Sequence, residues 1–319
     1  MIRNLFFIIL LLLFLPLSSW AAILYLEPAE GQYYRDDIFI VKIRIDTEGE
    51  CINTIKADLS FPQDVLEAID FSQGDSILAL WISQPEIDQS AGLISFIGGV
   101  PGGYCGRIPG DPGPSDLLGK IIFKVIGVKE NSAEVRFLDN SQVLLNDGLG
   151  TEATLNTQRA VLTLLSGISP NPKKEWQEEL TEDTIPPETF EVEIVRDPGI
   201  FEGKYFITFV TVDKQTGLDY FEVKEGEGDW QRENSPYLLK DQNLQSKILI
   251  KATDKAGNKR IIEYTPVLEK KLSLYFFYLY SVIVLALLGL IWWFIRRRIK
   301  RQTPESMDTT TNSFSIDDS

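Results

Sequence analysis

Residues Ile52–Pro62, with the sequence INTIKADLSFP, carry the pattern that decides the fold of the N-terminal half of this chain. Apolar residues occupy every second position from Ile55 to Phe61, and polar residues fill the positions between them. Because successive side chains of a strand point to opposite faces, this period of two predicts a strand with one buried face. The same alternation recurs at Phe39–Ile45 and Ile121–Val125, with Gly-containing turn signals between the segments. We therefore expect residues 22–165 to form an all-β sandwich of about nine or ten strands.

A second decisive stretch lies near the C-terminus, where Leu274–Ile295 is almost continuously apolar. At 1.5 Å per residue, about 22 helical residues span roughly 33 Å, enough to cross the hydrocarbon core of a bilayer. A buried core helix is the other interpretation, but soluble helices are rarely apolar on all faces. The basic cluster Arg296–Arg301 follows at once and indicates that residues 296–319, including a disordered tail, lie in the cytoplasm.

The N-terminus predicts export of the region that precedes this helix. Arg3 comes before the apolar run Leu5–Leu15, and Ser19 and Ala21 have the small side chains of a signal-peptidase site. We expect residues 1–21 to be a cleaved signal peptide; an uncleaved signal anchor is the alternative. Either outcome puts residues 23–271 outside the cytoplasm. We expect a single-pass protein of the cell membrane whose N-terminal domains are extracytoplasmic.

Composition excludes several classes of function. The 319 residues carry a formal charge of −15, which disfavours binding to nucleic acid. The chain has no histidine, so Ser-His-Asp catalysis and His-ligated metal sites are excluded. Carboxylate pairs such as Asp111 with Asp116, or Asp139 with Asp147, could in principle hydrolyse glycosides. Acidic residues in sandwich loops are usually solvated, and we therefore expect no enzyme.

The two cysteines, Cys51 and Cys105, both lie in the part expected to be exported. An oxidising compartment permits a disulfide between them, closing a loop of about 55 residues. Two free buried thiols are the alternative.

One aromatic residue and two acidic turns are candidates for binding. Trp81 could stack on a sugar or anchor a protein partner, or it could pack at the edge of the core. We expect no cofactor. Structural calcium could bind at Asp36–Asp37 or Asn146–Asp147, although Asp and Asn also favour turns for local reasons.

The second half of the exported region has its own organisation. Residues 166–187 are rich in Pro and Glu and read as a linker, with a short helix allowed around Lys174–Leu180. Residues 188–267 show strand patterns and a hairpin signal at Asp254–Asn258. We expect a smaller immunoglobulin-like sandwich of some seven strands there.

An ordered set of segments in residues 22–165 resembles a bacterial cohesin module, although none is diagnostic alone. The segments are Ile23–Pro28, Phe39–Ile45, Ile52–Pro62, Gly92–Gly99, Leu118–Val125, Val143–Gly148 and Ala160–Leu164. This resemblance implies a nine-stranded jelly-roll sandwich related to carbohydrate-binding modules. It also implies a non-catalytic receptor for dockerin modules in complexes that degrade polysaccharides. The Gly- and Pro-rich stretch Pro101–Ser115 is longer than a tight cohesin turn. The second domain, residues 188–267, is similar to bacterial immunoglobulin-like repeats that end in a D-x-A-G-N hairpin.

These observations predict a membrane-anchored binding protein at the cell surface, with a dockerin-like protein as its partner. The alternative is a carbohydrate-binding adhesion module, and an exported glycosidase is a third hypothesis. An exposed row of aromatic side chains would favour sugar, and a flat apolar face rimmed by Ser, Thr and Asn would favour protein. A buried carboxylate pair in a cleft would favour the enzyme.

Overall fold

The computed structural model describes residues 21–106, 116–128, 131–169, 171–265 and 274–300. The chain divides into two units, residues 1–266 and 267–319, and each is described by itself. Nearly all of the predicted signal peptide and the tail beyond residue 300 lie outside the described residues.

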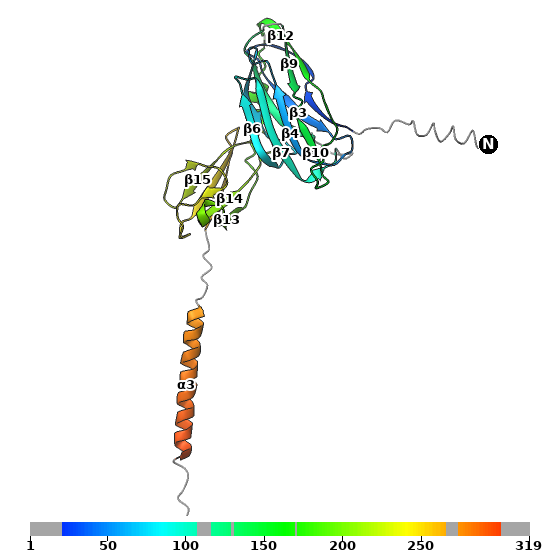
Figure 1. The fold of residues 1–319 in the computed structure, drawn as a ribbon. Helices are drawn as coiled ribbons and strands as arrows, with labels where there is room; N and C mark the ends of the chain where they lie inside the picture. Colours follow the sequence, from blue (N-terminus) through cyan, green and yellow to red (C-terminus); the bar gives the residue numbers. More distant parts are fainter. Residues whose placement is uncertain (1–20, 107–115, 129–130, 170, 266–273, 301–319) are drawn as a thin grey trace, which may run out of the picture. The chain divides into compact units, whose positions relative to one another are not determined.

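The N-terminal part of the first unit is an all-β sandwich, as the sequence predicts (Figure 1). One sheet has the order β11-β1-β3-β8-β5, and the other has the order β2-β12-β9-β4-β7-β6 with β10 beside β4. The strands are β1 (Ala22–Glu27), β2 (Glu30–Arg35), β3 (Ile38–Asp46), β4 (Ile52–Ser60), β5 (Leu66–Ser72), β6 (Leu80–Asp88), β7 (Leu93–Tyr104), β8 (Leu117–Val125), β9 (Ser132–Phe137), β10 (Gln142–Leu145), β11 (Leu155–Thr157) and β12 (Ala160–Ile168).

The first strand of the sandwich is divided between the two sheets. This division helps to explain why the sandwich has twelve strands instead of the nine or ten that the sequence predicts. The segment β1 pairs with β3 in the first sheet, whereas β2 pairs with β12 in the second sheet. Pro28 lies between them and has no amide to donate to either ladder. The chain therefore changes sheets at this residue.

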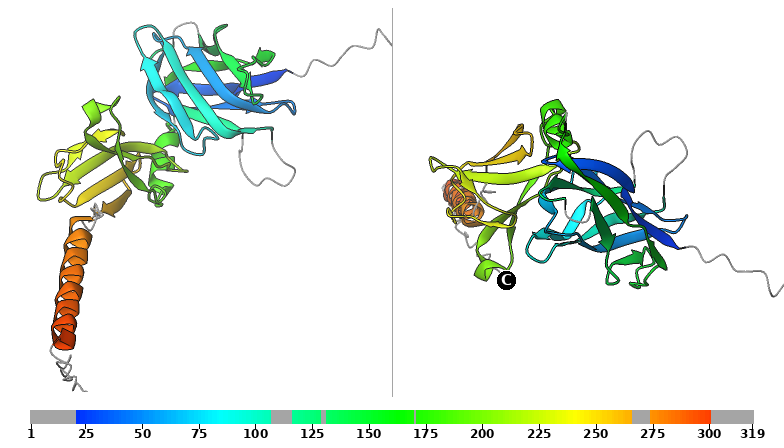
Figure 2. Two further views of the ribbon diagram at one scale, coloured as in Figure 1. Left: turned by 60° about the horizontal axis from the view of Figure 1, so that its bottom comes forward. Right: turned by 90° about the horizontal axis from the view of Figure 1, so that it is seen from above.

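The core of the sandwich follows the alternation seen in the sequence. In β4, the buried residues Ile55, Ala57 and Leu59 alternate with half-buried polar residues. Their inward side chains pack with those of nearly every other strand in a single apolar cluster. Figure 2 shows the two layers that enclose this cluster.

The predicted linker contains the helix α2 (Glu175–Glu182), which packs against β3. Trp176 is 5% exposed and contacts Ile40 and Ile122 of the sandwich. The preceding backbone is fixed as well, because the Ile38 amide donates to the Lys173 carbonyl over 2.9 Å. This segment therefore lies against the sandwich surface over much of its length.

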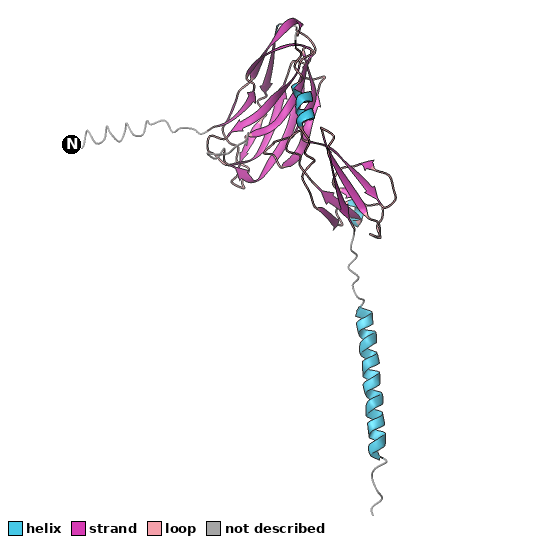
Figure 3. Cartoon of the chain, turned by 180° about the vertical axis from the view of Figure 1, so that it is seen from behind, coloured by secondary structure: helices cyan, strands magenta, loops and turns pink. Residues whose placement is uncertain are grey.

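The second β unit has seven strands in two sheets, with the orders β13-β14-β17 and β16-β15-β18-β19. They are β13 (Val192–Arg196), β14 (Tyr205–Phe209), β15 (Leu218–Glu225), β16 (Gln231–Arg232), β17 (Tyr237–Leu238), β18 (Ile248–Asp254) and β19 (Lys259–Tyr264), with the 3-10 turn η2 (Phe201–Gly203) before β14. The predicted hairpin joins β18 to β19, and Gly257 takes the positive φ of 92° that its turn requires. An immunoglobulin-like topology stays a prediction. Figure 3 shows that strands dominate both β units.

The second unit of the chain contains the helix α3 (Leu274–Lys300), drawn in orange and red in Figure 1. Its segment Phe277–Arg298 has 22 residues and a mean hydropathy of 2.2, and none of its most apolar stretch is buried against the described protein. By length and composition, this helix could cross a membrane.

Candidate functional site

The broadest candidate for a binding surface is the outer face of strands β4, β7 and β6, which are neighbours in one sheet. In β7, Ile94 and Phe96 point into the core, so Leu93, Ser95 and Ile97 point outward. The strand register places Ile97 between Lys56 of β4 and Ser83 of β6. We define the outer face by Thr54, Lys56, Leu80, Ile82, Leu93, Ser95 and Ile97.

This outer face combines exposed apolar side chains with small polar ones. Leu80, Ile82 and Leu93 are 54%, 60% and 38% exposed. Lys56 forms an ion pair with Asp58 at 3.2 Å, and the Asn140 amide donates to Asp58 over 2.6 Å. Among the described residues of the sandwich, every large hydrophobic side chain that is exposed is aliphatic. The face therefore has the apolar and polar mixture of a protein-binding surface, without a row of exposed aromatics.

Trp81 lies on the inner side of β6 rather than on the outer face. Its ring meets Phe71 and Phe96 edge-on, with centroids 6.2 and 5.6 Å apart. The side chain is half-buried and lines a cleft of about 290 Å³, which Val210 and Val212 line from the second β unit. These contacts are those of a residue at the edge of the core.

The predicted disulfide joins Cys51 to Cys105, with an S–S distance of 2.01 Å. Cys51 precedes β4 and Cys105 follows β7, and these strands pair through Ile52 and Tyr104. The disulfide therefore closes one end of the sheet that carries the outer face. Residues 107–115 of the Gly- and Pro-rich stretch lie outside the described residues.

The carboxylates considered for glycoside hydrolysis do not form an acid–base pair among the described residues. Asp116 is buried, but Arg44 forms an ion pair with it and the Tyr25 hydroxyl donates to it. Asp139 and Asp147 are exposed, and a hydrogen bond from the Thr151 side chain lowers the pKa of Asp147. Asp111 lies outside the described residues. A general acid needs a raised pKa, whereas the pKa of Asp147 is lowered.

The two turns considered for calcium are engaged in backbone hydrogen bonds. Asp37 accepts the Tyr34 amide over 2.8 Å and the Lys173 amide over 2.9 Å. Asn146 donates to the Gly102 carbonyl over 3.1 Å, and Asp147 accepts the Leu149 amide over 2.8 Å. These contacts fit the turn-forming interpretation of both sites.

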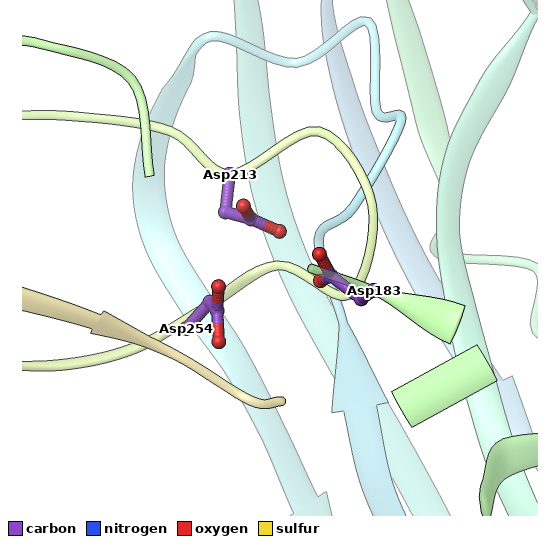
Figure 4. Close-up of side chains that lie close together, drawn as sticks. All are labelled: Asp183, Asp213 and Asp254. Carbon is purple, nitrogen blue, oxygen red and sulfur yellow. The ribbon is translucent and has the colours of Figure 1, made fainter. Parts of the chain in front are cut away.

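A different acidic group is brought together by the fold. One carboxylate oxygen from each of Asp183, Asp213 and Asp254 lies within 4.8 Å of the others, and all three residues are buried (Figure 4). No motif in the sequence singles out this group. Asp254 opens the hairpin motif and Asp183 opens the Pro-rich end of the linker, but neither position by itself signals that the carboxylates meet.

No protein-family model matches the sequence, and no curated protein matches it. Solved structures to which the chain is similar are cohesin modules. The OlpC cohesin of Clostridium thermocellum, solved in a cohesin–dockerin complex, is 10% identical, with a TM-score of 0.38, over 47% of this chain and 97% of the other. The sixth cohesin of scaffoldin B from Acetivibrio cellulolyticus, in complex with a mutant dockerin, is 12% identical, with a TM-score of 0.37, over 46% and 99%. The cohesin module of a family 33 glycoside hydrolase from Clostridium perfringens is 7% identical, with a TM-score of 0.34, over 45% and 95%.

Proposed function

We propose that this protein is a non-catalytic, membrane-anchored binding protein whose N-terminal sandwich binds a protein partner through the outer face of β4, β7 and β6. The observation that carries this proposal is the composition of that face, where exposed Leu80, Ile82 and Leu93 lie beside Thr54 and Ser95. Protein interfaces combine an apolar centre with a polar rim in this way.

The partner that we propose is an exported protein with a dockerin-like module. Support comes from the ordered segments of the sandwich that resemble a cohesin. By the same resemblance, the setting is a complex that degrades polysaccharides at the cell surface.

The helix α3 and the basic cluster after it support the anchoring part of the proposal. An apolar helix of this length suits a single span, and Arg296–Arg298 favour the cytoplasmic side. Both β units would then lie outside the cytoplasm, in a compartment where the Cys51–Cys105 disulfide persists.

The test is a titration of the full chain in lipid nanodiscs with a purified dockerin module and, separately, with soluble polysaccharides. We expect reversible binding of the dockerin. The variant Ile82→Asp should weaken it about tenfold or more, because a charge then enters an apolar contact surface. The matched control is Ile69→Asp, since Ile69 is also an exposed isoleucine but lies on the other sheet.

Three outcomes would contradict the proposal. They are equal loss of binding in both variants, binding of a polysaccharide but no dockerin, and hydrolysis of a glycan by the purified chain. Binding of a polysaccharide alone would favour the adhesion module instead.

A further inference from the structure

Three aspartates from separate segments converge at one end of the second β unit (Figure 4). Asp183 follows the last turn of α2, Asp213 lies between β14 and β15, and Asp254 is the last residue of β18. Their side chains belong to residues that are 5%, 5% and 1% exposed. The fold therefore withdraws three carboxylates from water into one small space.

Among the residues that the structure describes, no positive side chain pairs with this group. In the described part of the chain, none of the three aspartates forms an ion pair with Lys or Arg. The lysines adjacent to them in sequence are engaged elsewhere: Lys214 pairs with Glu188 at 2.6 Å, and Lys255 pairs with Asp70 at 2.8 Å. Burial, together with the neighbouring carboxylates, raises the pKa of Asp213 and of Asp254.

One oxygen of the group has no hydrogen-bond donor in the described parts of the chain. Asp254 Oδ1 accepts the Asn258 amide over 2.8 Å, whereas Asp254 Oδ2 is buried and has no partner. A buried carboxylate oxygen without a partner is costly, and proteins normally avoid it. This oxygen is independent evidence that a cation belongs beside it.

The other two carboxylates are held in place by donors on the protein. Asp213 Oδ2 accepts the amides of Gln215, Thr216 and Gly217, the last over 2.8 Å. Asp183 Oδ2 accepts the Thr216 hydroxyl over 2.6 Å. Each ionised carboxylate has about four acceptor positions, so oxygen capacity remains for a cation.

We propose that Asp183, Asp213 and Asp254 bind one calcium ion, which fastens the end of the linker to the second β unit. Ligands that are all oxygen select a hard cation. Two ligands on opposite sides of Ca²⁺ are about 4.6 to 5.2 Å apart, which suits oxygens within 4.8 Å of one another. Mg²⁺ usually keeps several waters, and a buried site leaves little room for them.

The ion would reinforce contacts that already join the same segments. The Asn258 side chain donates to the Asp183 carbonyl over 3.1 Å, and thus links the β18–β19 hairpin to the segment after α2. Neutralising the carboxylates removes their mutual repulsion, so the free energy of unfolding of the second β unit should rise with calcium concentration.

The experiment uses the full chain in detergent micelles, stripped of metal with a chelator and titrated with CaCl₂ or MgCl₂. Calorimetry should show one calcium bound per chain. At a concentration about 100 times the dissociation constant, the melting temperature of the second β unit should rise by roughly 15 °C. The variant Asp254→Asn should bind calcium at least about tenfold more weakly, because a charged ligand becomes neutral.

If the three aspartates bind a metal, the effect of Asp254→Asn on the melting temperature should change sign when calcium is added. A purely structural role would not produce this change. Without calcium, Asp254→Asn should melt higher than wild type, since a buried charge is removed; with calcium, it should melt lower. The matched control is Asp219→Asn in β15, an exposed aspartate that should leave both the melting temperature and calcium binding unchanged. Failure to bind calcium at about 5 mM, above the usual range of extracellular sites, would overturn the proposal, as would stabilisation by Mg²⁺ alone.

Discussion

The N-terminal sandwich and the second β unit handle buried charge in opposite ways. In the sandwich, buried Arg44 pairs with Asp116, and buried Lys120 pairs with Glu179 of α2 at 2.9 Å. In the second β unit, Asp183, Asp213 and Asp254 meet without a cation from the described residues.

The N-terminal sandwich and the second β unit also differ in the size of their cores. The sandwich has one apolar cluster that includes residues from nearly all its strands. The apolar cluster of the second β unit has only ten buried residues. Hydrophobic stabilisation grows with the apolar area buried, so the smaller unit has less to offset an uncompensated charge. Under our proposal, side chains of the protein compensate the buried charges of the sandwich, whereas a bound cation compensates those of the second β unit.

The largest expected effect concerns the disulfide, which only the sandwich has. Replacing both cysteines, as Cys51→Ala with Cys105→Ala, should lower the free energy of unfolding of the sandwich by about 4 kcal/mol, because the unfolded chain regains the freedom of a long loop. Scanning calorimetry of the full chain in micelles measures this loss. The transition of the second β unit should not move; an equal shift of both transitions would contradict the comparison.

The next effect comes from the buried ion pair. Arg44→Met leaves Asp116 buried without its positive partner and should destabilise the sandwich by about 3 kcal/mol. Adding Asp116→Leu should restore much of that loss, since both charges are then gone. Urea denaturation of the single and double variants measures the difference. If the double variant is no more stable than the single one, the pair does not neutralise the sandwich interior as proposed.

A smaller and local effect is expected at the linker. Trp176→Ala should release α2 from Ile40 and Ile122 and accelerate tryptic cleavage at Lys173 or Lys174 about 100-fold, because local opening governs proteolysis. Gln177→Ala on the exposed side of the same helix is the control. Cleavage of the wild type as fast as the Trp176 variant would mean that residues 166–187 behave as a free linker.

The smallest effect distinguishes the core edge from the outer face. Trp81→Ala should lower the free energy of unfolding of the sandwich by about 2 kcal/mol, because a half-buried ring leaves its contacts with Phe71 and Phe96. Ile82→Asp should change that free energy by less than about 0.5 kcal/mol, since the side chain is exposed. Denaturation curves decide this, and loss of partner binding by Trp81→Ala without loss of stability would make Trp81 an anchor instead.

The strands and the apolar helix could be predicted from the sequence because each rests on local information, and the disulfide could be predicted because the chain has two cysteines. The alternation from Ile55 to Phe61 specifies which face of β4 is buried wherever the strand pairs. The apolar composition of α3 is a property of its own residues. With two cysteines in the chain, one intramolecular pairing is available.

Tertiary structure decides whether an apolar residue packs in the core or lies on an exposed face. Trp81 and Ile82 are adjacent and both apolar, yet one packs on Phe96 and the other is exposed, because the register of β6 against β7 fixes which side chain points inward. Trp176 lies in a polar, Pro-rich segment, and only the neighbouring strand β3 gives its ring a place to pack.

The acidic group shows the same division between local and long-range information. The sequence alone placed Asp254 in the turn of a predicted hairpin and Asp183 in the predicted linker, two settings where aspartate is common. The tertiary structure alone decided that these three aspartates meet, since about 30 residues separate Asp183 from Asp213 and about 40 separate Asp213 from Asp254 along the chain. Their charges then interact over a few ångströms in a buried space, where the repulsion is far stronger than in water.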